Sequence, residues 1–370
     1  MLQFDRNIPY NALPLLPPSD IEHDPEILRK LVKASRALAS VNYNVLRIPN
    51  PLMLINTIAL QEAKTSTEIE NIFTTEDELY MAVSDTVKEG RTNFATKEVL
   101  RYREALWAGY NELIQKGRID INLVISIFRQ IKDTTAGLRP PQAIVTIKRG
   151  ESEFRPGETI YTPPRGAGIL EKLMENLIEY LHDDKKYPAD PLLKMCITHY
   201  QFEAIHPFQD GNGRTGRILN LLYLVNQNLL TQPVLYLSQY IIHHKDEYYY
   251  NLAGVTQRSD WKTWIMFMLD AVEKTAVVTS NLIDAILQQM AETFSHGKAS
   301  IKWYNKEINE ALFSQPYSRP KVIADVISKS SRTTITKYMD ELVKSRILVP
   351  RREGKEVYYL NEDLIRILQS

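Results

Sequence analysis

The sequence predicts a mainly α-helical fold with one short β-hairpin before residue 300, and three observations support this prediction. Apolar residues recur at helical spacing through most of the chain, as Leu28, Leu31 and Val32 illustrate near its start. A cluster of β-branched residues interrupts this pattern between Ala143 and Pro164. Helical stretches otherwise follow one another without the regular alternation of strand and helix that marks an α/β protein.

The composition of the 370 residues limits the classes of protein to consider. Hydrophobic residues make up 44% and charged residues 24%, the balance of a globular protein with two or three packed units. The 45 basic residues equal the 45 acidic residues, so no net charge draws the whole chain to nucleic acid or to an anionic membrane. We see neither a signal-peptide pattern nor an apolar stretch of membrane-spanning length, and we expect a cytoplasmic protein.

Cys196 is the single cysteine, which excludes an internal disulfide framework and a cysteine-rich zinc site. It lies in an apolar helical stretch, so we expect a buried and inert thiol. His199, His243 and His244 lack a companion set of metal ligands, and we expect core or solvated histidines. Trp261 and Trp264 stand at helical spacing and are expected to pack in the core.

The first 100 residues are expected to form an N-terminal helical domain. Asp24 followed by Pro25 is typical of a helix N-cap with proline at the first helical position. We place a core domain at residues 101–290. Helical patterns before the hairpin cover residues 58–63, 66–73, 76–88, 95–116 and 122–132.

The β-hairpin is predicted over residues 144–164. Residues 144–147 are β-branched, a glycine- and charge-rich turn follows, and residues 159–161 form the second strand. Pro163 and Pro164 close the hairpin because proline cannot join a central ladder. Helical periodicity resumes over residues 169–181 and 191–205.

Residues 291–370 have the element order of a winged helix-turn-helix. Val322 to Val326 form one short helix, Ser331 caps a second, and residues 347–349 and 357–360 flank a turn. Lys and Arg outnumber Asp and Glu here, and two basic surfaces are predicted to contact duplex DNA. Winged helices also serve as protein-interaction modules, so both readings stay open. The predicted DNA-facing residues are Ser331, Arg332, Thr333, Thr334, Thr336 and Lys337 on the helix, and Arg351, Arg352 and Lys355 on the wing.

One segment concentrates the reactive residue types, and it runs His206-Pro207-Phe208-Gln209-Asp210-Gly211-Asn212-Gly213-Arg214-Thr215-Gly216-Arg217. Pro207 disfavours helical backbone at the residue before it, so a helix should end at His206. Gly211 and Gly213 are both expected to take left-handed conformations that turn backbone N–H groups inward. Such a nest at the start of a new helix binds phosphate.

The side chains of this segment suit phosphoryl or nucleotidyl transfer. Arg214 and Arg217 are three residues apart on one helical face, so both can fork onto phosphate oxygens. Asp210 offers the hard oxygen that Mg²⁺ prefers, and a neutral His206 can accept a proton from a hydroxyl. Residues 211–216 also match the dinucleotide pattern G-x-G-x-x-G. A helical segment rather than a strand precedes them, and no acid stands about 20 residues onward, so that reading fails.

The segment resembles the Fic family signature H-P-F-x-[DE]-G-N-G-R-x-x-R and matches it at every fixed position. The resemblance covers about residues 20–285 and implies an all-helical core in which His206 is the general base and Asp210 holds Mg²⁺. Gly213 stands where the related Doc kinases carry lysine, which favours AMP transfer over phosphate transfer. The residues that the resemblance implies in ATP binding are Gly211, Asn212, Gly213, Arg214, Thr215, Gly216 and Arg217, with Tyr249 against the adenine.

Residues 66–71 are similar to the inhibitory motif [ST]-x-x-x-E-[GN] of Fic proteins, with Ser66 and Glu70 at its fixed positions. The resemblance implies that Glu70 pairs with Arg217 and blocks the place of the γ-phosphate. Thr67 and Glu70 also match an ordinary capping box, which stays open as an alternative. The hairpin corresponds to the family's flap, which docks a target segment by strand pairing, unless it is a plain surface hairpin.

The resemblance implies an ATP-dependent and Mg²⁺-dependent protein adenylyltransferase, repressed by Glu70, that modifies a Tyr, Thr or Ser hydroxyl of a target or of itself. A homodimer is expected from the family habit. Two alternatives stay open. In the first, Glu70 positions a water and the enzyme removes AMP from a modified protein. In the second, the chain is a DNA-bound regulator that uses its core as a nucleotide sensor.

Overall fold

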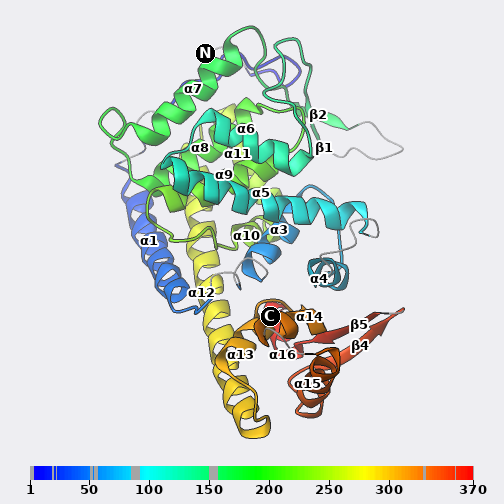
Figure 1. Cartoon of the computed structure of the whole chain (residues 1–370). Helices are drawn as coiled ribbons and strands as arrows, with labels where there is room; N and C mark the ends of the chain where they lie inside the picture. The colour runs from blue at the N-terminus through cyan, green and yellow to red at the C-terminus, as the bar shows by residue number, and fades with distance from the viewer. Residues whose placement is uncertain are drawn as a thin grey trace. The chain divides into compact units, whose positions relative to one another are not determined.

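The computed structural model describes residues 4–18, 21, 23–50, 53, 57–84, 92–149, 157–327, 331–354 and 356–369. These residues form a mainly α-helical fold with two small antiparallel sheets, which confirms the predicted class (Figure 1). The chain divides into two compact units. The first comprises Met1–Ala39, Glu104–Pro233 and Leu237–Thr275, and the second comprises Ser40–Arg103, Val234–Tyr236 and Ala276–Ser370.

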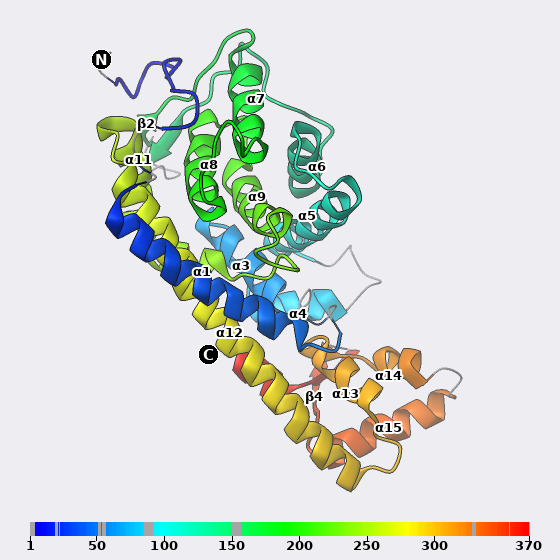
Figure 2. The same ribbon diagram turned by 90° about the vertical axis from the view of Figure 1, so that its left-hand side faces the viewer.

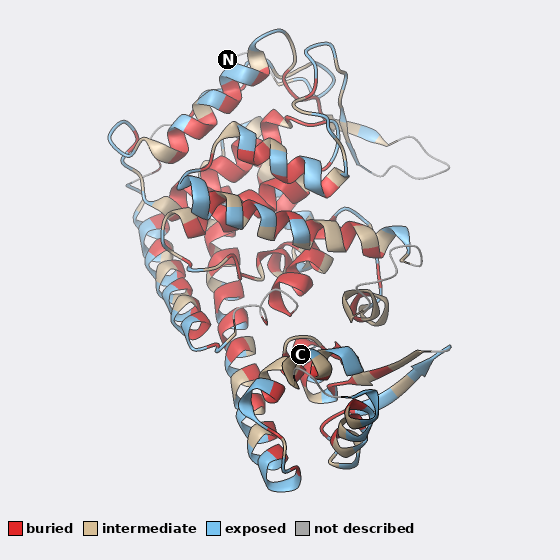
Figure 3. Cartoon of the chain, in the orientation of Figure 1, coloured by how far each residue is buried: buried red, intermediate tan, exposed pale blue. Residues whose placement is uncertain are grey.

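The first unit is centred on two helices, α8 (Pro191–Ile205) and α9 (Asn212–Asn226), which pack against each other. α6 (Ile121–Lys132) lies against α9, and α7 (Ile169–His182) lies against α6 and α8 (Figure 2). Almost every residue of α8 and α9 is buried (Figure 3). The loop between them, residues 206–211, is therefore anchored at both ends in the core of this unit.

Further helices complete the first unit. They are α10 (Leu237–His243), α11 (Lys245–Arg258), the start of α12 (Trp261–Ser300) and most of α1 (Pro25–Leu46). The Asp24 carboxylate accepts from the backbone N of Glu26 at 2.8 Å, which confirms the predicted cap of α1. Trp264 is buried and donates from Nε1 to the carbonyl of Cys196 at 2.8 Å. Burial raises the pKa of the Cys196 thiol, as expected for an inert cysteine.

The predicted hairpin consists of β1 (Ile147–Arg149) and β2 (Glu158–Tyr161), which are antiparallel with Ile147 opposite Tyr161. The prediction that the first strand starts at Ile144 is wrong, and Ile144 is 77% exposed. In this register, residues before Ile147 would face Pro163 and Pro164, which have no N–H to donate. The predicted turn, residues 150–156, lies outside the described residues.

The second unit contains α3 (Ile58–Ile69) and α4 (Glu76–Ser84), and α5 (Phe94–Lys116) contributes to both units. The prediction of separate helices at 58–63 and 66–73 is wrong, because one helix runs through to Ile69. The Thr67 hydroxyl donates to the carbonyl of Ala63 at 2.8 Å, so it supports the helix instead of starting one. The helix then ends where Asn71 turns left-handed, with φ 62°. The end of the predicted helix 76–88 lies outside the described residues from position 85 onward.

The winged helix-turn-helix of the second unit is confirmed. It comprises α13 (Lys306–Phe313), α14 (Pro320–Ile327), α15 (Arg332–Lys344) and a sheet of β3 (Tyr317–Ser318), β5 (Glu356–Leu360) and β4 (Val349–Glu353) in that order, followed by α16 (Glu362–Gln369). Ser331 caps α15 by accepting from the backbone N of Thr334 at 3.2 Å. Ile323, Met339 and Leu342 are fully buried in its core. Lys355 lies outside the described residues.

Two long helices run through the predicted domain boundaries. The boundary at residues 100/101 falls inside α5, and the boundary at 290/291 falls inside α12, which is 40 residues long. The compact units are discontinuous in sequence. The division into three domains therefore stays a prediction based on sequence.

Candidate active site

The candidate site begins where α8 ends. Ile205 is the last helical residue and His206 is the C-cap, with φ 50° and ψ 60° in the left-handed region. This confirms the prediction from Pro207, which disfavours helical backbone at the residue before it. His206 is half-buried at the mouth of the loop, whereas Ile205 and Pro207 on either side are buried. His206 is thus the most exposed of these three residues.

The loop is closed by the side chain of Asn212. Its Oδ1 accepts from the backbone N of Phe208 at 2.9 Å, and its Nδ2 donates to the carbonyl of the same residue at 2.9 Å. The Phe208 ring is fully buried and stacks on Phe128, with ring centroids 3.9 Å apart. These contacts fix the path of the loop from both sides, as expected for a core position at Phe208.

Gly211 and Gly213 have different backbone conformations. Gly211 is the N-cap of α9 with φ 79° and ψ 10°, so its predicted left-handed conformation is confirmed. Gly213 lies inside the first turn of α9, and the prediction of a left-handed conformation there is wrong. The helix starts at Asn212 because one left-handed residue suffices to turn the chain into it. The first N–H groups of α9 have no intrahelical acceptor and are available to an anion.

Asp210, the predicted metal ligand, is held by a residue that the sequence did not reveal. Its Oδ2 accepts from Nζ of Lys132 at 2.5 Å, and its Oδ1 accepts from the backbone N of Gly211 at 2.6 Å. Desolvation of the carboxylate by its neighbours alone would raise the pKa of Asp210. The hydrogen bond and charge of Lys132 outweigh this effect, so the pKa is lowered. Asp210 is therefore ionised and already accommodates a cation.

Arg214 and Arg217 lie one turn apart in α9 and are each only 2% exposed. Burial, together with the charge of Arg217, lowers the pKa of His199 to about 3, so this histidine is neutral. His199 is a core residue, as predicted, and its Nε2 lies 2.9 Å from the hydroxyl of Tyr248. The charge of Arg214 contributes to the low pKa of Asp210. The charge of Arg214 therefore reaches the loop at Asp210, whereas the charge of Arg217 reaches His199 in α8.

Thr215 and Gly216 are engaged in helix packing. The Thr215 hydroxyl donates to the carbonyl of Gly211 at 2.9 Å and is fully buried. A Cβ on Gly216 would lie 2.6 Å from Oε1 of Glu203 and 3.0 Å from the ring of Phe202, so a larger residue would require the side chains of α8 to shift. Nucleotide contact at these two positions stays a prediction. Tyr249 is 37% exposed and meets Tyr248 edge-on at 5.2 Å, and its contact with adenine also stays a prediction.

The proposed inhibitory motif lies at the C-terminal end of α3. Ser66 and Thr67 are fully buried inside this helix, and Glu70 is its exposed C-cap. The capping-box alternative is wrong, because Thr67 is an interior residue of the helix and not its N-cap. Glu70 belongs to the second unit and Arg217 to the first, so their pairing stays a prediction.

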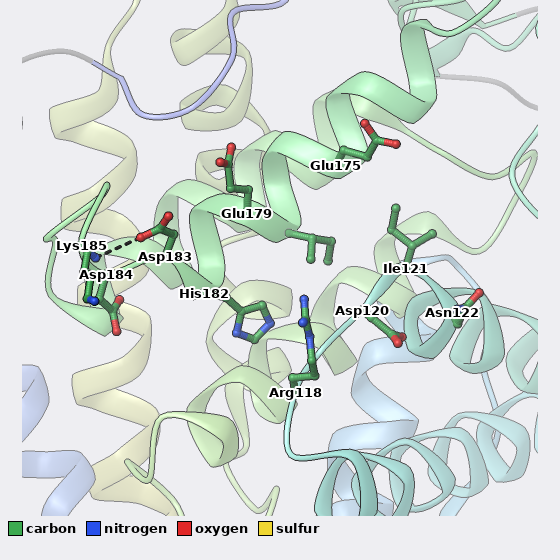
Figure 4. A pocket seen from close by; sticks show the side chains of 11 residues that line it. Arg118, Asp120, Ile121, Asn122, Glu175, Glu179, His182, Asp183, Asp184 and Lys185 are labelled. Atoms are coloured by element: carbon green, nitrogen blue, oxygen red, sulfur yellow. Dashed lines mark hydrogen bonds between the residues drawn. The ribbon is translucent and has the colours of Figure 1, made fainter.

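A separate open pocket of about 820 Å³ lies between the start of α6 and the end of α7 (Figure 4). It contains none of the residues 206–217 and includes an acidic set that comprises Asp120, Glu175, Glu179, Asp183 and Asp184. Several of these carboxylates have structural partners. Asp120 caps α6 at the backbone N of Leu123, and Glu179 pairs with Lys186 at 2.8 Å. We therefore place the candidate active site at the loop.

No cluster of three or more His, Cys, Asp or Glu side chains suited to a metal ion occurs in the described part of the chain. A divalent cation at Asp210 would therefore need oxygens from its ligand and from water, as Mg²⁺ commonly does with nucleotides. Among the described helices, none combines the length and hydropathy required to cross a membrane.

Comparison with known proteins finds family models over three stretches of the chain. Residues 28–111 match the Fic/DOC family N-terminal domain, and residues 118–224 match the Fic/DOC family itself. Residues 286–364 match the C-terminal domain of SoFic-like protein adenylyltransferases. The protein adenylyltransferase Fic of Aedes aegypti is 30% identical over 162 residues, which are 42% of this chain and 31% of that protein. The one of Culex quinquefasciatus is 32% identical over 112 residues, which are 30% of this chain and 21% of that protein.

Solved structures support the fold. A Fic family protein from Desulfovibrio desulfuricans superposes with a TM-score of 0.58 at 21% identity, covering 93% of this chain and 98% of that chain. Fic-1 from C. elegans superposes with a TM-score of 0.52 at 16% identity, covering 69% of this chain and 72% of that chain. The chain spans less than a third of the length of the two mosquito relatives.

Proposed function

Because the chain belongs to the Fic family, we propose that it is a nucleotidyltransferase that moves AMP from ATP to a Tyr, Thr or Ser hydroxyl of a protein. One observation carries the proposal. A histidine at the C-cap of α8 and a left-handed glycine at the N-cap of α9 bracket one short loop, and two buried arginines follow in the next two turns. This arrangement combines a proton acceptor with a site for polyphosphate.

In the proposed step, His206 accepts the proton of the target hydroxyl. The hydroxyl oxygen forms a bond to the α-phosphorus of ATP, and the bond from that phosphorus to the oxygen bridging to the β-phosphate breaks. Pyrophosphate leaves with the electron pair. Arg214 and Arg217 would stabilise the negative charge that grows on the leaving group. The N–H groups at the start of α9 would hold the phosphates in line for attack.

The loop suits Mg²⁺ at Asp210. The carboxylate is ionised, its side chain is 68% exposed, and it already holds the ammonium of Lys132. A single carboxylate with phosphate oxygens and water is a common way to bind Mg²⁺. When bound, the ion would supply positive charge to the phosphates. Lys132 would then have to release Asp210, and its charge would remain near the phosphates.

We extend the proposal to repression by Glu70. The support is that Ser66 and Thr67 are fully buried inside α3, while Glu70 ends the helix at an exposed position. A capping box would have explained the presence of Thr67 and Glu70 without any inhibition. The bounds of α3 exclude it, because Thr67 lies inside the helix. A carboxylate presented at a helix end can pair with a guanidinium and so compete with a γ-phosphate.

The experiment uses purified parent, Glu70→Gly and His206→Ala proteins with Mg²⁺ and ATP labelled at either the α or the γ position. We expect label from the α position only, strongest in Glu70→Gly and absent in His206→Ala. Label from the γ position would mean that the protein transfers phosphate and not AMP. Equal α label in parent and Glu70→Gly would remove repression while leaving transfer intact.

Reversal of the chemistry is tested on a protein that already carries AMP. Release of AMP by the parent, lost in Glu70→Gly, would mean that the same site removes AMP and that Glu70 activates water. We expect no release by the parent, because the proposed purpose of Glu70 is to exclude the γ-phosphate.

We further propose that α15 contacts duplex DNA. Arg332 and Lys337 are exposed on this helix. The wing contributes less than the sequence predicts, because Arg351 pairs with Asp77 of α4 at 2.8 Å within the same unit. If a gel-shift assay finds no salt-sensitive binding of the parent protein to duplex DNA, this part of the proposal is wrong.

A further inference from the structure

Four consecutive backbone carbonyls at the end of α8 are satisfied by only two residues. The carbonyl of residue 204 accepts from the hydroxyl of Tyr161 at 2.8 Å. Arg139 serves the other three carbonyls. Its Nη2 donates to the carbonyl of residue 205 at 3.2 Å, its Nε to that of residue 206 at 2.8 Å, and its backbone N to that of residue 207 at 2.9 Å. The last carbonyls of a helix have no partner inside it. Arg139 therefore acts as the cap of α8, although it lies 67 residues away from His206.

The same guanidinium also reaches the end of the hairpin. Nη2 of Arg139 donates to the carbonyl of Pro164 at 2.5 Å, just beyond β2. Tyr161, the last residue of β2, donates to the neighbouring carbonyl, that of residue 204, so the hairpin is joined to the end of α8 at two neighbouring points. Burial raises the pKa of Tyr161 well above its ordinary value, which keeps its hydroxyl protonated as a donor.

Arg139 is a buried cation that serves carbonyl groups. It is 4% exposed, and burial lowers the pKa of its guanidinium below the ordinary value. In the part of the chain that the structure describes, it forms no ion pair with a carboxylate. Its charge faces the C-terminal end of α8, where the helix dipole is negative. The hydrogen bonds and the dipole together offset the cost of desolvation.

His206 has a backbone that needs such support. The left-handed region is disfavoured for a residue with a side chain, and it persists where the surroundings hold it. Arg139 binds the carbonyl of this strained residue and the carbonyls of the residues before and after it. Without these three hydrogen bonds the loop would relax toward ordinary backbone and turn the imidazole away from its present position.

We propose that Arg139 is a positioning residue that holds His206 in place for proton transfer and couples it to the β-hairpin. This inference rests on the proposed AMP transfer, because it gives the geometry of the proposed base a purpose. The prediction is that loss of Arg139 slows the chemical step more than it weakens ATP binding. A residue needed only for the fold would affect both alike.

The test compares Arg139→Gln, Arg139→Lys and Arg129→Gln, each in the Glu70→Gly background. Arg129 is the matched control, since it is exposed and its Nε donates to the carbonyl of Ala136 at 2.8 Å, with no hydrogen bond to residues 204–207 among the described residues. We measure kcat and KM for ATP in AMP transfer. Independently, we measure hydrogen exchange of the amides of residues 206–212 without nucleotide.

For Arg139→Gln we expect kcat to fall about 100-fold, the effect of a misplacement of roughly 1 Å, with KM for ATP within about threefold of the reference. Amides 206–212 should exchange faster, whereas those in the middle of α9 should not change. Arg139→Lys should recover about tenfold in kcat, because its ammonium keeps the charge and some of the bonds. Arg129→Gln should match the reference.

An unchanged kcat in Arg139→Gln, or equal losses in kcat and ATP binding with faster exchange throughout α8 and α9, would overturn the inference. If Arg139→Gln does not fold, Arg139→Lys decides: a selective loss in kcat supports the inference, and a kcat equal to the reference overturns it. If no protein transfers AMP, the proposed function fails. Exchange at residues 206–212 still shows in that case whether Arg139 holds the loop.

Discussion

Two regions of the molecule carry positive charge, and they place it in opposite environments. Arg214 and Arg217 in α9 are each 2% exposed, whereas Arg332 and Lys337 in α15 are exposed. The exposed cations of α15 stand among acids, and Lys337 lies 3.8 Å from Glu341. Burying a charge costs free energy, while an exposed charge keeps its water. We therefore expect the buried pair to be the more specific of the two proposed phosphate sites, because a ligand there would meet charges that water does not screen.

The same contrast separates the two halves of the proposed regulation. The loop 206–211 is fixed by contacts within one unit, including the bonds from Asn212 and Arg139. Glu70 ends a helix in the other unit. A site built from local contacts can be prepared in advance, whereas an inhibitor on another unit can be withdrawn. A regulatory switch requires both features, a site that is already formed and an inhibitor that can leave it.

The largest expected effect is on Arg217. We expect Arg217→Gln to weaken ATP binding about 100-fold, because charge-assisted bonds to phosphate are worth up to about 3 kcal/mol where water is excluded. Isothermal titration with ATP and Mg²⁺ measures this. Arg332→Gln is the exposed control and should leave the affinity unchanged. Equal affinities of all three proteins would show that the buried guanidinium does not bind the nucleotide.

The next effect is on stability against pH. The pKa of buried His199 is lowered from 6.5 to about 3, so between these values the unfolded chain binds a proton that the folded chain does not. The free energy of unfolding should therefore fall as pH drops below 6.5, by up to about 1.4 kcal/mol per pH unit from this group.

Urea unfolding at pH 7 and pH 5.5 checks this expectation for the parent, His199→Gln and His243→Gln. His243 is exposed and serves as the control. The His199→Gln protein should lose less stability between the two pH values than the other two proteins. The same loss in all three would mean that the burial of His199 does not govern this part of the pH dependence.

A smaller effect is expected at Lys132, which is intermediate between the two environments at 25% side-chain exposure. Lys132→Met frees Asp210 from its ion pair, which at such exposure is worth up to about 1 kcal/mol. The Mg²⁺ concentration for half-maximal ATP binding should therefore fall by up to about fivefold. Binding of a fluorescent ATP analogue during Mg²⁺ titration measures it. An unchanged Mg²⁺ requirement with weaker ATP binding would place Lys132 on the phosphates instead.

The sequence predicted those parts of the site that depend on neighbours in the chain. Pro207 predicted the end of α8 at His206, and Gly211 predicted the turn into α9, because both effects act over one or two residues. Lys132 and Arg139 were missed because they lie 78 and 67 residues from the atoms they bind. No local pattern encodes such contacts. Gly213 was misjudged because helix formation from Asn212 onward overrode its conformational freedom.

The smallest expected effect belongs to α15. Exposed cations bind DNA by displacing counterions, so Arg332→Ala and Lys337→Ala should each lower the slope of log affinity against log salt by about 1, with little dependence on DNA sequence. Fluorescence anisotropy with a labelled duplex at several salt concentrations measures the slopes, and Arg217→Gln serves as the buried control. If neither substitution changes the slope, these residues do not bind DNA, and protein binding becomes the better interpretation of the exposed face of α15. The buried arginines would then be the only phosphate site proposed among the described residues.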